Sequence, residues 1–181
     1  MTNVTSTGKK LNCRTCADSA VRVQGMERTL ILGVGNILQK DDGIGVFVVN
    51  QLLESGMELP GHVDIMDGGT AGLDLIPIMY EYDRIIIIDA LKVADHPGSV
   101  YRFTPEYLLS SSSRVSLHEI GISEILNMLK IQGANPEVEI IGIVPEDIET
   151  LEIAISPAVA DAVPRVMDLI LEAVGQNVKR V

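Results

Sequence analysis

The feature that most constrains the fold is a run of four isoleucines, Ile85 to Ile88, between Arg84 and Asp89. β-Branched residues favour extended backbone, and successive side chains of a strand point to opposite faces of the sheet. A strand that is apolar on both faces must be covered on both, which is typical of a central parallel strand with helices on each side. The run therefore predicts a buried central strand over 84–89.

Strand-like and helix-like segments alternate along the rest of the chain. The predicted strands are 28–34, 63–66, 84–89, 99–103 and 138–144. The segment 99–103 is less apolar than the others, as expected of an edge or antiparallel strand. Apolar residues spaced three or four apart predict helices in between and after the last strand. We therefore predict an α/β fold, a single three-layer domain with a twisted, mostly parallel sheet of about five strands flanked by helices.

Three prolines and two capping residues bear on the helices. Thr70 is predicted to cap a helix that runs toward Tyr82, and Pro77 shortens or kinks that helix. Ser156 followed by Pro157 predicts another helix start, with serine as the N-cap and proline in the first turn. Pro164 then predicts a kink in the last helix.

Residues 1–25 differ in composition from the rest of the chain. Ser, Thr, Asn, Gly and Lys dominate there, and no apolar segment follows the basic residues as it would in a secretory signal. We expect a disordered leader in front of one domain over 26–181. Its Cys13 and Cys16 are the only cysteines, and they lack the strand-to-helix context of a redox motif. Two cysteines make no disulfide scaffold, so a reducing, cytoplasmic compartment is expected.

The charge balance excludes one class of partner. The chain has 25 acidic and 14 basic residues and a formal net charge of −11. This excess repels phosphate backbones and disfavours a nucleic-acid partner. No apolar run reaches the length of a membrane span, so no membrane partner is predicted either. We expect a monomer.

The loop after the first strand invites a dinucleotide-binding interpretation, because Gly33 and Gly35 lie between a strand and a helix. The full fingerprint needs a third glycine where this chain has Leu38, and no Gly-Lys-Ser/Thr follows. Asp41 and Asp42 stand before the helix, where a phosphate would have to bind. Either acid could simply cap the helix. A nucleotide-binding domain is therefore kept only as an alternative.

Two acids and one histidine are candidate metal ligands. In open parallel sheets, sites form beyond the carboxyl ends of the strands, near the point where strand order reverses. Asp42 lies in the loop after one such strand and Asp89 ends another. Two neighbouring carboxylates repel each other unless a proton or a cation intervenes. His118 precedes a predicted amphipathic helix. Two carboxylates and one imidazole suit a first-row divalent ion with open coordination positions.

Four motifs, in their order and spacing, resemble those of the hydrogenase maturation endopeptidases. They are Gly33-Val-Gly-Asn-Ile-Leu-Gln-Lys-Asp-Asp-Gly-Ile-Gly45, Asp67-Gly-Gly-Thr-Ala-Gly72, Ile88-Asp89-Ala90 and Ser116-Leu-His118. The resemblance runs from about Thr29 to Gly175, so it covers nearly everything but the leader. It implies an α/β fold with a mainly parallel sheet. It also implies the removal of a C-terminal peptide from the large-subunit precursor of a nickel–iron hydrogenase, after nickel has been inserted.

The resemblance also assigns residues. The metal-contacting positions of the family match Asp42, Asp89 and His118, which would then be the catalytic and metal-binding residues. They would recognise nickel carried by the substrate, so no permanent cofactor is required. Gly68, Gly69 and Thr70 match a loop that lines the cleft and contacts the substrate. The leader with Cys13 and Cys16 has no counterpart in the family pattern.

The sequence lacks the motifs of two common classes of hydrolase. It contains no Gly-x-Ser-x-Gly and no His-Glu-x-x-His, so neither a serine-hydrolase elbow nor a zincin helix is available. What is left is metal-assisted hydrolysis, through a polarised carbonyl or an activated water with a carboxylate as base. We therefore expect a metal-dependent endopeptidase. A non-catalytic assembly chaperone of the same subunit is the second alternative.

Overall fold

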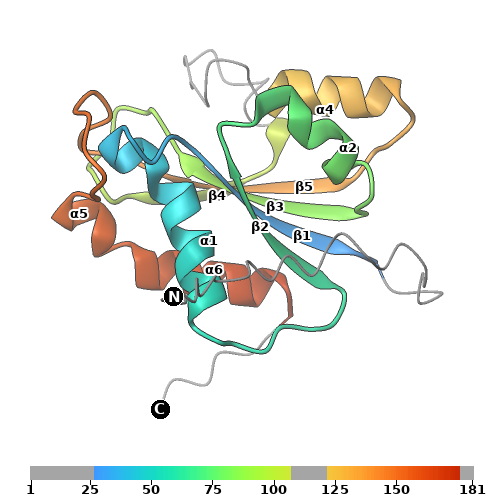
Figure 1. The fold of residues 1–181 in the computed structure, drawn as a ribbon, viewed down its shortest axis with the longest axis horizontal. Coiled ribbons are helices and arrows are strands. Elements are labelled where there is room, and N and C mark those ends of the chain that lie inside the picture. The colour runs from blue at the N-terminus through green and yellow to red at the C-terminus, as the bar shows by residue number, and fades with distance from the viewer. Residues whose placement is uncertain (1–26, 107–121, 176–181) are drawn as a thin grey trace, which may run out of the picture.

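The computed structural model describes residues 27–106 and 122–175, which form a five-stranded sheet with helices on both faces (Figure 1). The strands are β1 (Thr29–Val34), β2 (Val63–Gly69), β3 (Arg84–Ala90), β4 (Val100–Phe103) and β5 (Glu137–Ile143). Their order across the sheet is β2-β1-β3-β5-β4. β1 pairs in parallel with β2 and β3, and β3 pairs in parallel with β5. The expected mostly parallel sheet of about five strands is confirmed.

The last strand in the sheet order confirms a second expectation. β4 pairs antiparallel with β5 and forms one edge of the sheet. Its four residues are exposed or only half-buried, whereas four of the seven residues of β5 are fully covered at its carboxyl end. The lower hydrophobicity of 99–103 reflects this position, because an edge strand is covered less completely than a central one.

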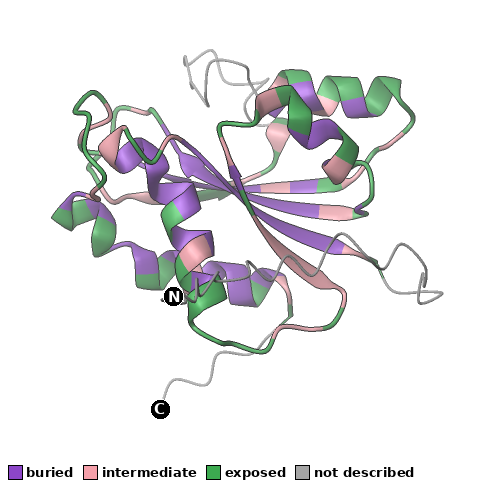
Figure 2. Cartoon of the chain, in the orientation of Figure 1, coloured by how far each residue is buried: buried purple, intermediate pink, exposed green. Residues whose placement is uncertain are grey.

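The isoleucine run lies at the centre of the sheet, and its side chains pack in two separate hydrophobic cores. Ile86 and Ile88 pack in the core beneath α1 (Ile44–Glu54) and α6 (Val163–Ala173). Ile85 and Ile87 point the other way, into the core beneath α2 (Ile76–Met79) and α4 (Ile122–Ile131). All four side chains are at most 1% exposed, and β1 and β3 are almost entirely buried (Figure 2).

The local signals for helix ends were only partly right. The helical segment after β2 begins as a 3-10 turn, Gly72–Leu75, with Ala71 in the capping position, so the prediction that Thr70 caps it was wrong. Ser156 does precede the short helix α5 (Pro157–Ala160), although its side-chain oxygen accepts no capping hydrogen bond. Pro164 kinks no helix, because it lies in the first turn of α6, where its missing N–H costs nothing.

Several predictions concern residues outside the described ranges. The leader with Cys13 and Cys16 and the candidate ligand His118 lie there. Within the ranges that are described, no helix is both long and apolar enough to cross a membrane.

The glycines around the first loop let α1 approach the sheet very closely. A Cβ on Gly45 would lie 2.1 Å from the carbonyl oxygen of Ile88 and 2.4 Å from that of Val34. A Cβ on Gly33 would lie 2.2 Å from the carbonyl oxygen of Gly45. The start of α1 therefore rests directly on the backbone of β1 and β3. These glycines serve helix–sheet contact, which explains the glycine-rich pattern without a phosphate.

We expect Gly45→Ala to destabilise the protein strongly. The new methyl group would meet main-chain oxygens that cannot rotate away, so α1 must shift, at a cost of about 3 kcal/mol. Urea unfolding followed by circular dichroism measures this change. Gly61→Ala is the matched control, because its Cβ would have no heavy atom within 4 Å. An unfolding free energy for Gly45→Ala within about 1 kcal/mol of the Gly61→Ala value would contradict the close approach.

Candidate functional site

The strand order places a crevice at the carboxyl ends of β1 and β3. From β1 the chain crosses to β2 on one side, and it then returns to β3 on the other side of β1. At such a reversal the connections leave in opposite directions, so the space above the strand ends stays open for a ligand. The loops that follow β1, β2 and β3 meet there.

Asp42 belongs to the loop after β1. It lies in a 3-10 turn, Lys40–Gly43, directly before α1, and is 2% exposed. One carboxylate oxygen accepts a hydrogen bond from the N–H of Asn36, 3.0 Å away. The turn sits tightly over the strand end, because a Cβ on Gly35, whose φ is +134°, would lie 2.0 Å from the carbonyl oxygen of Asp42. Only glycine fits at that position.

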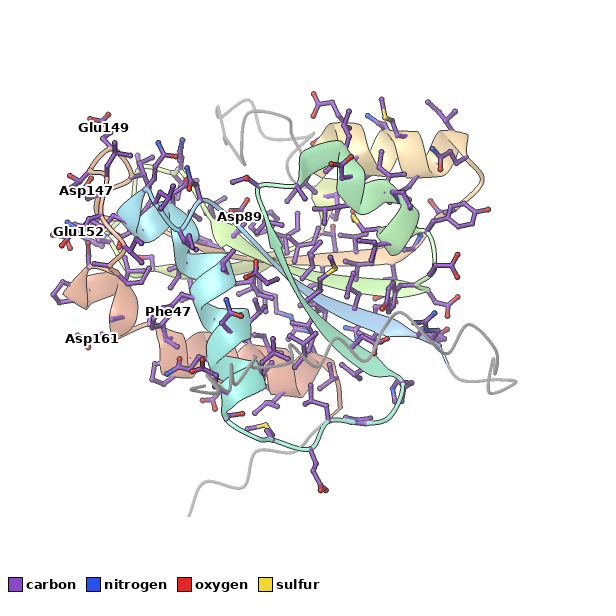
Figure 3. All side chains as sticks on the ribbon, in the orientation of Figure 1. Phe47, Asp89, Asp147, Glu149, Glu152 and Asp161 are labelled. Carbon is purple, nitrogen blue, oxygen red and sulfur yellow. The ribbon has the colours of Figure 1, made fainter. Side chains whose placement is uncertain are left out.

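Asp89 is the penultimate residue of β3 and follows the isoleucine run. It is fully buried, and its Oδ1 accepts a hydrogen bond from the N–H of Ala90 at 2.7 Å. Figure 3 labels Asp89 near the end of the central strands. A carboxylate at the end of an otherwise aliphatic strand contributes nothing to apolar packing, so its place calls for a chemical explanation.

Asp42 and Asp89 line the same cavity, whose volume is about 430 Å³. Gly69 and Thr70 line it as well, whereas Gly68 does not. The apolar part of the wall comes from β1, β3, the turn before α2, and α4, including Leu32, Val34, Ile87, Leu75 and Ile125. An apolar hollow with two enclosed carboxylates is the usual form of a small site that orients a polar group.

The side chain of Asp67 holds the end of β2 in place. The Oδ1 of Asp67 accepts the N–H of Gly69, and the Oδ2 of Asp67 accepts the side-chain amide of Asn50 on α1, both at 3.0 Å. Gly69 has a φ of +47°, which favours glycine. Gly68 is buried, and an added Cβ would lie 2.8 Å from Leu32 and 3.2 Å from the carbonyl oxygen of Gly33. Of the three loop positions, Gly68 therefore packs against β1, while Gly69 and Thr70 face the cavity.

Asp41 and Asp42 are neighbours with different surroundings. Asp41 is fully buried and does not line the cavity. Its carboxylate accepts three main-chain N–H groups, from Ser156 at 2.6 Å and from Glu146 and Asp147 at 2.9 Å. It thereby ties the loop after β1 to the segment between β5 and α5. Of the two acids, Asp41 holds the backbone and Asp42 faces the cavity.

The described part of the chain supplies two of the three predicted metal ligands. It contains no group of three or more His, Cys, Asp or Glu side chains arranged to hold a metal ion. Asp42 and Asp89 share the cavity wall, but His118 lies outside the described ranges. Two enclosed carboxylates fit a divalent cation only if a further donor completes the set.

Three polar residues of the cavity were not singled out from the sequence. Asn36 and Gln39 line it from the loop after β1, and the side-chain amide of Asn36 donates to Gln39 Oε1 at 3.0 Å. Lys92, just beyond β3, is the only basic residue among the described residues of the wall. The rule that placed Asp42 and Asp89 at the strand ends applies equally to all three, so attention to uncharged and basic residues in the same loops would have found them.

Comparison with known proteins decides the family. A family model described as hydrogenase maturation protease matches residues 46–173. The hydrogenase 2 maturation protease of Escherichia coli K12 is 34% identical over 153 residues, which cover 83% of this chain and 92% of that protein. This chain belongs to the hydrogenase maturation protease family. The resemblance read from the four motifs is thereby confirmed.

A longer relative and two solved structures agree with this assignment. The expression/formation protein HupD of Rhizobium leguminosarum is 37% identical over 125 residues, which cover 67% of this chain and 61% of HupD. The maturating endopeptidase HybD of E. coli superposes with a TM-score of 0.73 at 34% identity, over 82% of this chain and 92% of HybD. HybD of Thermococcus kodakarensis superposes with a TM-score of 0.68 at 29% identity, over 81% of this chain and 99% of that protein. The α/β fold is thus that of the hydrogenase maturation proteases.

Proposed function

We propose that this hydrogenase maturation protease removes the C-terminal peptide from the large-subunit precursor of a nickel–iron hydrogenase, once that precursor carries nickel. The observation that carries the proposal is the pair of enclosed carboxylates, Asp42 and Asp89, on the wall of one cavity at the strand-order reversal. Family membership supports the protease activity. The two carboxylates support a site that receives a cation.

The nickel ion is part of the substrate in this proposal. Two carboxylates on the wall of one cavity repel each other, and the positive charge of the precursor's nickel would offset that repulsion on docking. Asp42, Asp89 and His118 would complete its coordination, because carboxylate and imidazole are both suitable ligands for Ni²⁺. A precursor without nickel would lack the ion that these three side chains bind. Selectivity for nickel-loaded precursor would therefore follow from coordination of the metal.

The same cavity offers groups for peptide hydrolysis. A carboxylate on its wall can accept the proton of an attacking water, which is the usual task of a general base. Gly69 and Thr70 would lie along the substrate backbone next to that point. Lys92 would place a positive charge where the scissile carbonyl oxygen gains negative charge, as in other electrostatically stabilised transition states.

With only two cysteines in the chain, we assign the activity to the cytoplasm.

A processing assay tests the proposal against the chaperone alternative. Purified protein is mixed with nickel-loaded precursor, and the mass of the large subunit is followed by mass spectrometry. The expected result is loss of the C-terminal peptide, with nickel-free precursor left intact. A precursor that is bound but keeps its full mass would favour the chaperone. Equal cleavage of both precursors would refute nickel recognition.

A further inference from the structure

A patch of exposed aliphatic side chains lies beside the cavity. It consists of Ile37 and Leu38 from the loop after β1, and Leu151 and Ile153 from the segment between β5 and α5. These side chains are 47%, 54%, 79% and 75% exposed, respectively. A single exposed aliphatic residue needs no explanation, but four in two adjoining loops indicate a surface that another molecule covers. We call these four residues the outer patch.

The two loops that form the outer patch are joined by main-chain hydrogen bonds. The N–H of Glu152 donates to the carbonyl oxygen of Leu38, and the N–H of Lys40 donates to that of Glu152, both at 3.0 Å. Asp41 adds its three hydrogen bonds to the same segment. The patch is therefore held in place by the fold, and a partner would lose little affinity to the ordering of these loops.

Asp147 fixes the turn that carries Leu151. Its Oδ1 accepts the N–H groups of Glu149 and Thr150 at 3.0 Å, and its Oδ2 accepts Lys40 Nζ at 3.0 Å. Hydrogen bonds from Thr150, and then from Lys40, hold the pKa of Asp147 well below its usual range. The carboxylate therefore stays ionised and paired with Lys40 at any ordinary pH.

The outer patch is flanked by acids that are exposed. Glu149 and Glu152 lie on the same segment as Leu151 and Ile153, and Figure 3 shows them together with Asp147 at one end of the molecule. Lys40 is paired with Asp147, so it offsets only part of the negative charge of this segment. The surface thus combines aliphatic side chains with an excess of negative charge. Its complement is a segment that carries aliphatic and basic side chains.

The outer patch is continuous with the cavity. Asn36 and Gln39 line the cavity on either side of Ile37 and Leu38, and Ile148 lines it three residues before Leu151. The two loops therefore have one side in the cavity wall and the other at the surface. A substrate held in the cavity would therefore lie close to the patch.

We propose that the outer patch docks a segment of the protein substrate that carries aliphatic side chains next to lysine or arginine. The proposal rests on the proposed function, because it places this segment on the large-subunit precursor. Aliphatic contact supplies the affinity, while Glu149 and Glu152 steer the approach and fix the orientation of the segment.

Two variants separate the apolar and charged contributions in the full-length protein. Leu151→Ser/Ile153→Ser should raise the KM for nickel-loaded precursor at least about tenfold and change kcat less than about twofold, because docking precedes the chemical step. Glu149→Lys/Glu152→Lys should also raise KM. The unmodified protein should show a KM that rises with salt, and this variant should show a weaker rise. Both variants should keep the melting temperature, since these side chains are exposed.

Matched controls lie on other parts of the surface. Ile131→Ser removes an aliphatic side chain that is 85% exposed, at the end of α4, and Glu81→Lys reverses a charge just before β3. Both should leave KM unchanged. An unchanged KM in the two test variants, or an equal rise in the controls, would overturn the docking proposal. So would a dimer of the unmodified protein that Leu151→Ser/Ile153→Ser converts to monomer, since the patch would then bind a second copy. Absence of cleavage by the unmodified protein would instead refute the proposed function, and the docking proposal would then be decided by the Kd of precursor binding.

Discussion

Asp89→Asn is expected to lower the rate of precursor processing by at least about 100-fold, the scale of losing a group that handles protons or charge in the reaction. The amide is nearly the same size as the carboxylate, so the packing at the end of β3 is preserved. It cannot accept a proton at neutral pH and is a poor ligand for a divalent cation. The measurement is cleavage of nickel-loaded precursor under single-turnover conditions.

The fold of the Asp89→Asn variant should be intact or slightly more stable. Asp42 and Asp89 share one cavity wall, and removal of one charge relieves the repulsion between them in the free protein. Asp161→Asn, which removes a charge from an exposed position, is the control for both activity and stability. If Asp89→Asn unfolds at a much lower temperature than Asp161→Asn, then Asp89 is a structural residue and its chemical role is refuted.

Asp41→Asn should lower the stability of the fold strongly, in contrast to Asp89→Asn. The carboxylate accepts three main-chain N–H groups in a fully buried position. An amide offers one acceptor oxygen in place of two and directs an NH₂ group at a main-chain donor. Buried donors then lose their partners, at a cost of about 4 kcal/mol in the free energy of unfolding. Chemical denaturation measures this loss.

Asp42→Asn is the matched comparison, one residue further along the chain. We expect it to unfold within about 1 kcal/mol of the unmodified protein, because the amide oxygen can still accept the N–H of Asn36. Its processing activity should nevertheless be lost. If Asp41→Asn and Asp42→Asn lost the same amount of stability, the assignment of a structural role to Asp41 and a role in activity to Asp42 would be wrong.

The architecture was predictable because its signals are local. Ile85 to Ile88 required cover on both faces, and the structure provides one core on each side of β3. The weaker pattern at 99–103 indicated an edge strand, and β4 is one. Asp42 and Asp89 could be placed at the same edge of the sheet because parallel strands end there, Asp89 lies at the end of its strand and Asp42 lies in the loop that follows its strand.

Other features depend on contacts between distant segments and left no local signal. The bonds of Asp41 reach residues more than a hundred positions away, so its sequence context could not separate it from Asp42. Thr70 looks like a capping residue, but Ala71 occupies the capping position of the 3-10 turn, whose first residue, Gly72, has a φ of +54°. Gly68 packs against β1 because the pairing of β1 with β2 shifts register there: Gly33 pairs with Asp67 and Val34 with Gly69, so Gly68 is left between them.

Anomalous diffraction from crystals soaked with Ni²⁺ or Cd²⁺ tests nickel recognition most directly. We expect one ion in the cavity, with Asp42, Asp89 and His118 all within about 5 Å of a common point and, for Ni²⁺, with metal–ligand bonds of roughly 2 Å. Occupancy should fall below about pH 6, where the imidazole gains a proton and can no longer coordinate. An ion bound elsewhere, or one held in the cavity without His118, would contradict nickel recognition by these three residues.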